Sequence, residues 1–263
     1  MKLVSVLVTA ALLAGDLAAQ IDLTVTPANA TPGQMVTVKL TNNSNATWTL
    51  PTLCVFRSVH ETGCQDTAVL NLFCGGSLVS VAPGQSVSQT WDQLDDNGGQ
   101  VDRGTYAFRA SIFDPSFTMR TFCAQVDISS CSTPPTHYGP SSAGQNGQSP
   151  MIGFKQDPKI GTVNFELRLA DGIPTGNAIV LLGIPDQTGT PVGWGTVLLD
   201  TNLPIISSPV IGLDGQGNAV LPAVIPNDAS LIGGTVGLQL ATLDPSSTGN
   251  IAHSRGLSIT ICP

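Results

Sequence analysis

The stretch Met35-Val36-Thr37-Val38-Lys39-Leu40-Thr41 decides the fold of this chain. Its apolar side chains alternate with polar ones, which is typical of a β-strand with one face in a core and the other in water. Turn signals stand on both sides, Thr31-Pro32-Gly33 before it and Asn42-Asn43-Ser44-Asn45 after it. Short strand-like runs separated by such turns recur along the whole chain, so we expect an all-β protein.

The expected strands lie close together in the sequence. In the N-terminal part they cover residues 21–26, 35–41, 48–50, 53–59, 69–73, 78–81, 86–91, 105–113 and 117–128. In the C-terminal part they cover residues 162–170, 178–184, 195–199, 205–213, 218–224, 235–243 and 257–262. Only the segment 226–231 predicts a helical turn, because Asn227 or Asp228 can cap it.

The composition also favours strands over helices. Of the 263 residues only 11% are charged, against ~25% in typical soluble domains. With two Glu and four Lys, the chain has few residues for the solvated face of a helix. The hydrophobic fraction of 41% is too high for a disordered chain. A net charge of −8 disfavours a nucleic-acid partner.

Residues 1–19 predict a secretory signal peptide. Lys2 supplies the positive charge, an apolar run covers residues 3–14, and Ala18-Ala19 precede Gln20, the expected mature N-terminus. The apolar run is too short to span a bilayer. Asp16 stands where a lipoprotein signal needs a cysteine. We therefore expect a secreted or periplasmic protein that is soluble after signal removal, with no membrane insertion.

A change in composition divides the mature chain into two units. Residues 129–150 contain four Pro, three Gly and six Ser but no charged residue, which predicts a linker or an irregular loop leading into the second unit. Nine of the thirteen aromatic residues lie within residues 20–130. We expect two antiparallel β-sandwich domains, residues 20–128 with an aromatic core and residues 151–263 with an aliphatic core, each long enough to fold by itself.

An even number of cysteines in an exported chain predicts disulfides; the six are Cys54, Cys64, Cys74, Cys123, Cys131 and Cys262. Cys131 lies in the segment leading into the second unit and Cys262 in the last strand of that unit, so we expect them to pair and tie its two ends together. The other four allow three connectivities. A hairpin turning near residues 62–65 favours Cys54 with Cys74, which leaves Cys64 with Cys123. The alternatives are a Cys123–Cys131 pair with a free Cys262, or some free buried thiols.

The end of the first unit resembles a known family. Val81-Ala82-Pro83-Gly84, Trp91-Asp92-Gln93, Asp95-Asp96-Asn97-Gly98 and Gly104-Thr105-Tyr106 follow one another in order. With them, residues 22–128 resemble the intracellular proteinase inhibitor (BsuPI) domain. The resemblance implies an immunoglobulin-like β-sandwich and raises proteinase inhibition as a function. No inhibitory residue carries over, and the chain departs from that family in its export signal and in the cysteines of this unit.

The second unit carries a softer resemblance. Tyr138-Gly139, Leu181-Leu182-Gly183, Asp214-Gly215-Gln216-Gly217 and Ile225-Pro226-Asn227-Asp228 occur in order before a last hydrophobic strand. In this respect the unit, with Cys131 tied to it, is similar to a C-terminal β-module of bacterial secreted proteins. This resemblance implies no activity.

Few residues suggest site chemistry, and no cofactor or metal is expected. The carboxylates of Asp92, Asp95, Asp96 and Asp102 could bind calcium, or they are simply solvated groups of a hairpin turn. The histidines have no motif of a catalytic base around them; His60 is expected at an exposed loop or strand end, and the others are His137 and His253.

Two tryptophans carry further expectations. Trp194 stands in a loop-like segment, where it either stacks on a sugar or caps the second core. Trp91 is expected to pack in the first core, because it ends a strand-like run.

Two functions remain open. The first is a secreted, non-catalytic binding or structural protein of the cell exterior, whose partner is a protein or a glycan. The second is a proteinase inhibitor, which needs a rigid exposed loop that loses little entropy on entering a protease cleft. The segment His60–Asp66, braced by Cys64, is the candidate loop. No enzyme activity is expected.

Overall fold

The computed structural model describes residues 20–263 except residue 67 and residues 145–148, so the expected signal peptide lies outside the described residues. The described chain is built almost wholly of β-strands, which confirms the all-β fold class. The helical turn expected in segment 226–231 is present as a short 3-10 helix, Ala229–Leu231. Asp228 caps it by accepting a hydrogen bond from the backbone N–H of Ser230 at 2.9 Å.

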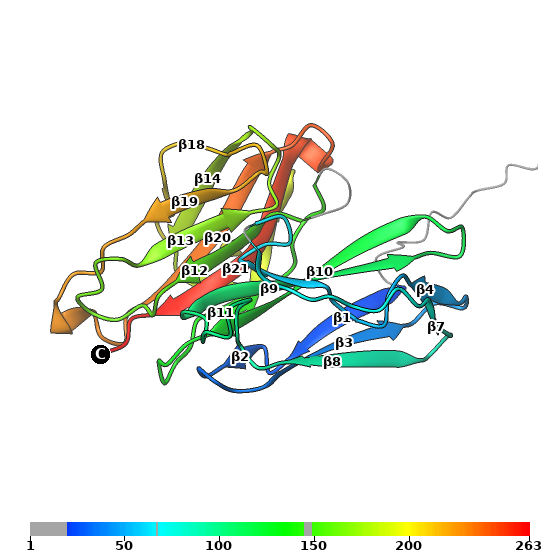
Figure 1. Ribbon diagram of the computed structural model, residues 1–263. Helices are drawn as coiled ribbons and strands as arrows, with labels where there is room; N and C mark the ends of the chain where they lie inside the picture. Colours follow the sequence, from blue (N-terminus) through cyan, green and yellow to red (C-terminus); the bar gives the residue numbers. More distant parts are fainter. Residues whose placement is uncertain (1–19, 67, 145–148) are drawn as a thin grey trace, which may run out of the picture.

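The first half consists of two facing sheets (Figure 1). One sheet has the order β1 (Ile21–Thr26), β3 (Val36–Asn42) and β8 (Ser86–Trp91). The other is centred on the antiparallel pair β9 (Gly104–Phe113) and β10 (Met119–Ile128). Shorter strands extend it: β2 (Asn29–Ala30), β4 (Trp48–Leu50), β5 (Ser58–Glu61), β6 (Ala68–Asn71) and β7 (Val79–Val81). The chain crosses from β3 to β4 in the opposite sheet and returns to β3 with β8, as in immunoglobulin-like sandwiches.

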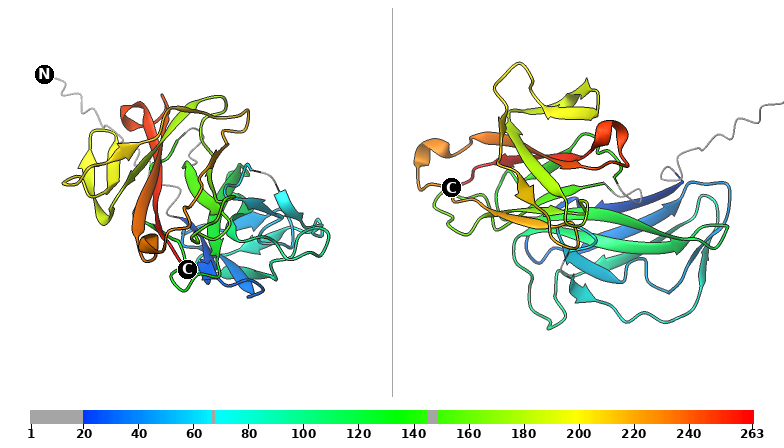
Figure 2. Two further views of the ribbon diagram at one scale, coloured as in Figure 1. Left: turned by 90° about the vertical axis from the view of Figure 1, so that its left-hand side faces the viewer. Right: turned by 90° about the horizontal axis from the view of Figure 1, so that it is seen from above.

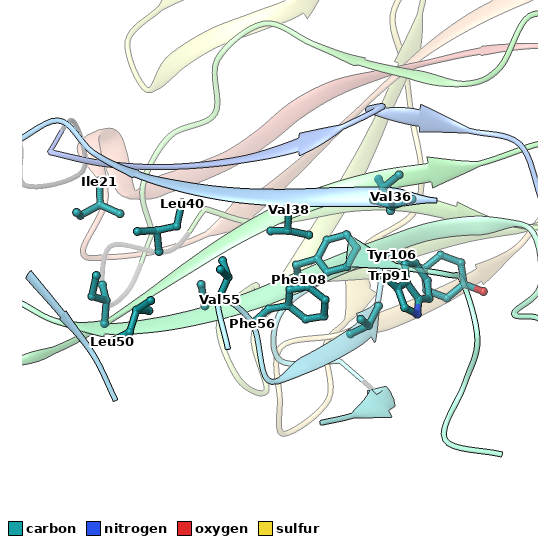
Figure 3. Close-up of a cluster of buried hydrophobic side chains, with 14 of the residues drawn as sticks. Ile21, Val36, Val38, Leu40, Leu50, Val55, Phe56, Trp91, Tyr106 and Phe108 are labelled. Atoms are coloured by element: carbon teal, nitrogen blue, oxygen red, sulfur yellow. The ribbon is translucent and has the colours of Figure 1, made fainter. Parts of the chain in front are cut away.

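An aromatic core fills the space between these sheets (Figure 3). Trp91 is 2% exposed, as expected of a core residue, and its ring meets Tyr106 and Phe108 edge to face at 5.6 and 5.5 Å. The Tyr106 hydroxyl donates a hydrogen bond to the backbone carbonyl of Asp102 at 2.8 Å. A tyrosine that closes back on the chain upstream of its strand is the tyrosine corner of immunoglobulin-like domains. The two ends of the stretch from Trp91 to Tyr106 therefore pack side by side in this core.

The second half is another pair of facing sheets. One contains β12 (Met151–Lys155), β13 (Glu166–Ala170) and β19 (Ala219–Pro222). The facing sheet contains β11 (Thr136–Tyr138), β21 (Ile251–Thr260), β20 (Thr235–Leu243), β14 (Asn177–Gly183), β17 (Ile206–Ser207) and β18 (Ile211–Gly212). The hairpin β15 (Pro185–Val192) and β16 (Gly195–Leu199) pairs separately. The core between them is mostly aliphatic, and its members come from residues 152–261 alone.

Some element boundaries were predicted wrongly. The expected linker over 129–150 contains β11, whose Tyr138 is buried and donates its hydroxyl hydrogen to the carbonyl of Leu198 at 2.8 Å. The expected strand over 205–213 breaks into β17 and β18, because Ser208 and Pro209 interrupt it. β12 and β15 were not foreseen. The polar, glycine-containing sequence of β15 looks like a turn, although it forms a strand with an irregular register.

The two halves share a continuous sheet, in which β12 lies beside β9 (Figures 1 and 2). Lys155 is the register partner of Gly104 at this joint. Gly104 has a φ of 154°, and a Cβ there would lie 2.7 Å from the carbonyl oxygen of Phe154, so only glycine fits. Glu61 adds ion pairs across the joint to Lys155 and Arg168, at 3.2 and 2.8 Å.

Three disulfides are present, and each is the pairing preferred from the sequence. Cys131–Cys262 ties the start of the second half to its last residues, across a sequence separation of 131. Cys54–Cys74 joins two segments of the first half, and Cys64–Cys123 attaches the turn after β5 to β10. No free cysteine occurs in the described residues.

Asp114 makes the hairpin between β9 and β10 sensitive to acid. The Ser116 hydroxyl is the main cause that lowers the pKa of Asp114 to about 2, and the Thr118 N–H and Arg120 contribute in the same direction. Because the folded-state pKa lies below the unfolded value, this contribution is present above about pH 4 and is lost as the pH falls toward 2. The melting temperature of Asp114→Asn should therefore fall less steeply over this interval than that of the natural chain. Parallel curves in calorimetric scans would contradict this expectation.

Candidate functional site: an arginine-lined pocket

A cavity of about 440 Å³ lies in the first half of the molecule. This volume is within the usual range for sites that hold small ligands. We call it the arginine pocket, and its lining residues are Pro51, Thr52, Cys54, Val55, Arg57, Ser58, Asn71, Leu72, Phe73, Arg109 and Ser111. The lining contains two arginines, several hydroxyls and no acidic residue.

The alternation of β9 places Arg109 in this pocket. Phe108, Ala110 and Ile112 of the strand are fully buried in the core, so Arg109 and Ser111 face the opposite side of the sheet. Arg109 is the register partner of Ser58 on the neighbouring strand β5. A central position in the sheet fixes the backbone from which this guanidinium extends.

The segment that carries Arg57 is irregular but firmly held. The backbone N–H groups of Val55 and Phe56 both donate to the side-chain oxygen of Gln89, at 2.9 and 3.3 Å. Phe56 is 1% exposed and packs edge to face on Phe108 with ring centroids 4.9 Å apart. With Phe56 anchored in the core, Arg57 is left exposed at the pocket.

The Cys54–Cys74 disulfide joins the two walls of the pocket. Cys54 precedes Arg57 on one wall, and Cys74 follows Phe73 on the other. Phe73 has 104% relative exposure, so its apolar side chain is not buried against the rest of the chain. A large aromatic side chain held in water beside a pocket is a candidate contact for a ligand.

The two pocket arginines differ from the arginines that bond within the chain, of which Arg255 donates to the carbonyls of Gly139 and His137. Arg103, Arg120 and Arg168 form ion pairs with carboxylates. Within the described residues, no ion pair joins Arg57 or Arg109 to a carboxylate, although the charge of Arg109 acts on the Asp171 carboxyl and opposes the rise in its pKa that burial causes. In a chain with a net charge of −8, two such guanidinium groups at one cavity form a local site for an anion, because guanidinium binds carboxylate, sulfate and phosphate in a bidentate manner.

Ser58 and His60 form a hydrogen-bonded pair at the edge of the pocket. The Ser58 Oγ lies 2.7 Å from His60 Nε2, and His60 Nδ1 lies 2.9 Å from the carbonyl oxygen of Asp66. A carbonyl can only accept, so Nδ1 carries the hydrogen and Nε2 accepts from Ser58. Burial is the main cause that lowers the pKa of His60, and Arg109 acts in the same direction. The expectation of an exposed His60 is wrong, since its side chain is buried in β5.

The loop considered for protease inhibition does not stand free. In segment 60–66, Thr62 and Cys64 are fully buried. Asp171 of the second half accepts hydrogen bonds from the backbone N–H groups of Cys64 and Gln65, both at 3.0 Å. The Thr62 carbonyl accepts from the Gln125 side chain at 2.7 Å. A segment held on both sides in this way cannot extend into a protease cleft without separating from the second half.

Trp194, His253 and His137, singled out from the sequence, are not among the residues that line the pocket. Trp194 is half-buried and meets His253 edge to face at 5.8 Å, so it covers that side chain. His253 Nε2 accepts from the Thr196 N–H at 3.3 Å, and burial lowers the pKa of His253. His137 lies 3.4 Å from a carboxylate oxygen of Asp127.

The carboxylates of the acidic turn after β8 accept hydrogen bonds from that turn and from β6. Asp92 accepts from the N–H of Leu94, and Asp95 accepts from those of Asn97 and Gly99. Asp96 accepts from the backbone and side chain of Asn71. No group of three or more acidic, histidine or cysteine residues suited to a metal ion occurs in the described part of the chain.

Among known proteins, similarity to this chain is found with solved structures. No family model and no curated protein matches the chain. A transglutaminase from red sea bream is similar with a TM-score of 0.28 and 10% identity, over 93% of this chain and 31% of that one. The human OSCAR ligand-binding domain has a TM-score of 0.24 and 12% identity, over 91% and 97% of the two chains. A tandem repeat of a large adhesion protein has a TM-score of 0.23 and 13% identity, over 91% and 49%.

At these TM-scores the likenesses carry no argument about function. The chain spans about a third of the length of the transglutaminase. Only the residues of this chain can therefore support a functional conclusion.

Proposed function

We propose that this chain is a secreted, non-catalytic binding protein of the cell exterior, which holds an anionic group of its ligand in the arginine pocket. The observation that carries the proposal is the pair Arg57 and Arg109, which line one cavity without a carboxylate partner in the described residues. An anion that enters this cavity could form charge-assisted hydrogen bonds with a guanidinium group that has no ion pair of its own.

The three disulfides support the cell exterior as the compartment. Disulfides persist in oxidising compartments and are rare in the reducing cytosol. The expected signal peptide over residues 1–19 is consistent with export. Across the residues that the structure describes, no helix has the length and apolar character needed to cross a membrane.

A calorimetric titration of the mature chain with acetate and with sulfate tests this function. The natural chain should bind at least one of these anions, and Arg57→Ala with Arg109→Ala should abolish the binding. Lys39→Ala is the matched control, since Lys39 is an exposed cation on β3, in the opposite sheet of the sandwich. Binding that survives loss of both arginines, or that Lys39→Ala weakens equally, would remove the pocket as the site.

The same protein tests the absence of catalysis. Ser58 and His60 have the mutual geometry of a nucleophile and its base, so the test must include them. We expect neither turnover of a simple activated ester nor labelling by a fluorophosphonate. Turnover that Ser58→Ala abolishes, while anion binding is retained, would show that the pocket belongs to an enzyme.

A further inference from the structure

The arginine pocket combines three kinds of group that a single ligand class uses together. Guanidinium groups from Arg57 and Arg109 match a carboxylate. Ser58, Asn71 and Ser111 also line the cavity, and they can bond neutral hydroxyls with the positions that their contacts with His60, Asp96 and Thr121 leave open. Phe73 offers a fully exposed aromatic face at the rim. We propose, building on the binding function above, that the ligand is an acidic oligosaccharide whose uronic-acid unit enters the pocket.

The role of Phe73 follows from the electrostatics of its ring. An aromatic face carries partial negative charge, and the C–H hydrogens of a sugar ring carry partial positive charge, so the two surfaces attract while both lose contact with water. A peptide carboxylate or an inorganic anion has no such flat C–H surface. The exposure of Phe73 therefore favours a sugar over these anions.

The charge of the whole protein limits the kind of anion. With a net charge of −8, the chain repels a densely charged polymer before that polymer reaches two arginines. A ligand with one carboxylate flanked by neutral units keeps the local attraction and avoids most of the repulsion. An oligosaccharide with isolated uronic-acid units has this character, whereas nucleic acid and polyphosphate do not.

The backbone around the pocket is held in place before any ligand arrives. Gln89 and the buried Phe56 hold the Arg57 segment, and the Cys54–Cys74 disulfide fixes the segment of Phe73 beside it. Little backbone ordering is then left for the binding step, which raises affinity for a small ligand.

The test is a calorimetric titration of the mature chain with uronic-acid disaccharides of gluco and galacto configuration. Each is compared with its neutral counterpart, with acetate and with the peptide Gly-Asp-Gly. We expect one acidic disaccharide to bind at least ten times more tightly than its neutral counterpart and than acetate. Arg109→Ala and Arg57→Ala should each remove this preference for the acid, and Lys39→Ala should leave it intact.

Phe73→Ala separates recognition of the sugar from recognition of the charge. It should weaken the acidic disaccharide about tenfold and leave acetate binding unchanged. If acetate or Gly-Asp-Gly binds as tightly as either disaccharide, or if Phe73→Ala changes nothing, the sugar inference fails while the anion site stands. If none of these anions binds, both the inference and the proposed function fail.

Discussion

The double variant Cys131→Ala/Cys262→Ala should unfold with a free energy about 5 kcal/mol lower than that of the natural chain. The bond closes a loop across a sequence separation of 131, and a cross-link over so many residues removes much entropy from the unfolded chain. The folded state should survive. The Cys262 N–H still donates to the Pro158 carbonyl at 3.0 Å, and β21 remains paired with β20. Denaturant unfolding followed by circular dichroism measures the difference.

The matched control removes a disulfide that closes a shorter loop. Cys54→Ala/Cys74→Ala opens a bond with a sequence separation of 20, so its expected loss is smaller, about 3 kcal/mol. If this variant loses as much stability as Cys131→Ala/Cys262→Ala, or more, chain entropy is not the dominant contribution of these bonds. The shorter loop also contains Arg57 and Phe73, so the same variant should bind anions less tightly even where it remains folded.

Replacing Asp171 by alanine should lower the free energy of unfolding by about 2–3 kcal/mol, since it leaves the buried N–H of Cys64 without an acceptor and removes the bond to the Gln65 N–H. Asp171 is 6% exposed and accepts from Cys64 and Gln65 across the joint between the halves. Burial is the main cause that raises the pKa of Asp171, so the ionised carboxylate has a desolvation cost that the substitution relieves. The lost hydrogen bonds should outweigh that relief.

The joint gives this variant a second readout. In Asp171→Ala, the amide hydrogens of the turn after β5 should exchange faster than in the natural chain. The amide hydrogens in the cores of both halves should keep their exchange rates. Asp186→Ala is the control, because Asp186 accepts hydrogen bonds from Thr188 and Gly189, close to it in the sequence. Unchanged exchange at Cys64 and Gln65 in Asp171→Ala would show that these amides need no acceptor from the second half.

The fold was predictable from the sequence because the deciding residues act locally. The alternation around Val36, Val38 and Leu40 requires one buried face, and these three side chains have 0% exposure. Trp91 and Tyr106 were recognisable through the turn chemistry between them. The disulfides were predictable from the order of the cysteines along the two units. β11 was missed because proline and glycine on both sides of it suggest a loop, whereas pairing with β21 makes it a strand.

The candidate site was not predictable from the sequence for a different physical reason. Arg57 and Arg109 are ordinary arginines in the sequence, and their significance depends on which carboxylates the fold places near them. Asp157 pairs with Arg103, and Glu61 pairs with Arg168. The outward position of Arg109 on a regular strand was the one available signal. The contact of Ser58 with His60 was not predicted either, because it also depends on the folded conformation.

The positions of the disulfides also determine how the molecule would respond to mechanical tension. A pull between Ile21 and Pro263 reaches Cys262 and passes through its sulfur directly to Cys131, so residues 132–261 carry no load. The Cys64–Cys123 bond shields residues 75–122 in the same way. Only the segments outside these covalent shortcuts can extend, by roughly 3.5 Å per residue. The second half would thus keep its structure while the first sandwich is pulled apart, including β5 and the end of β10, which flank Arg109.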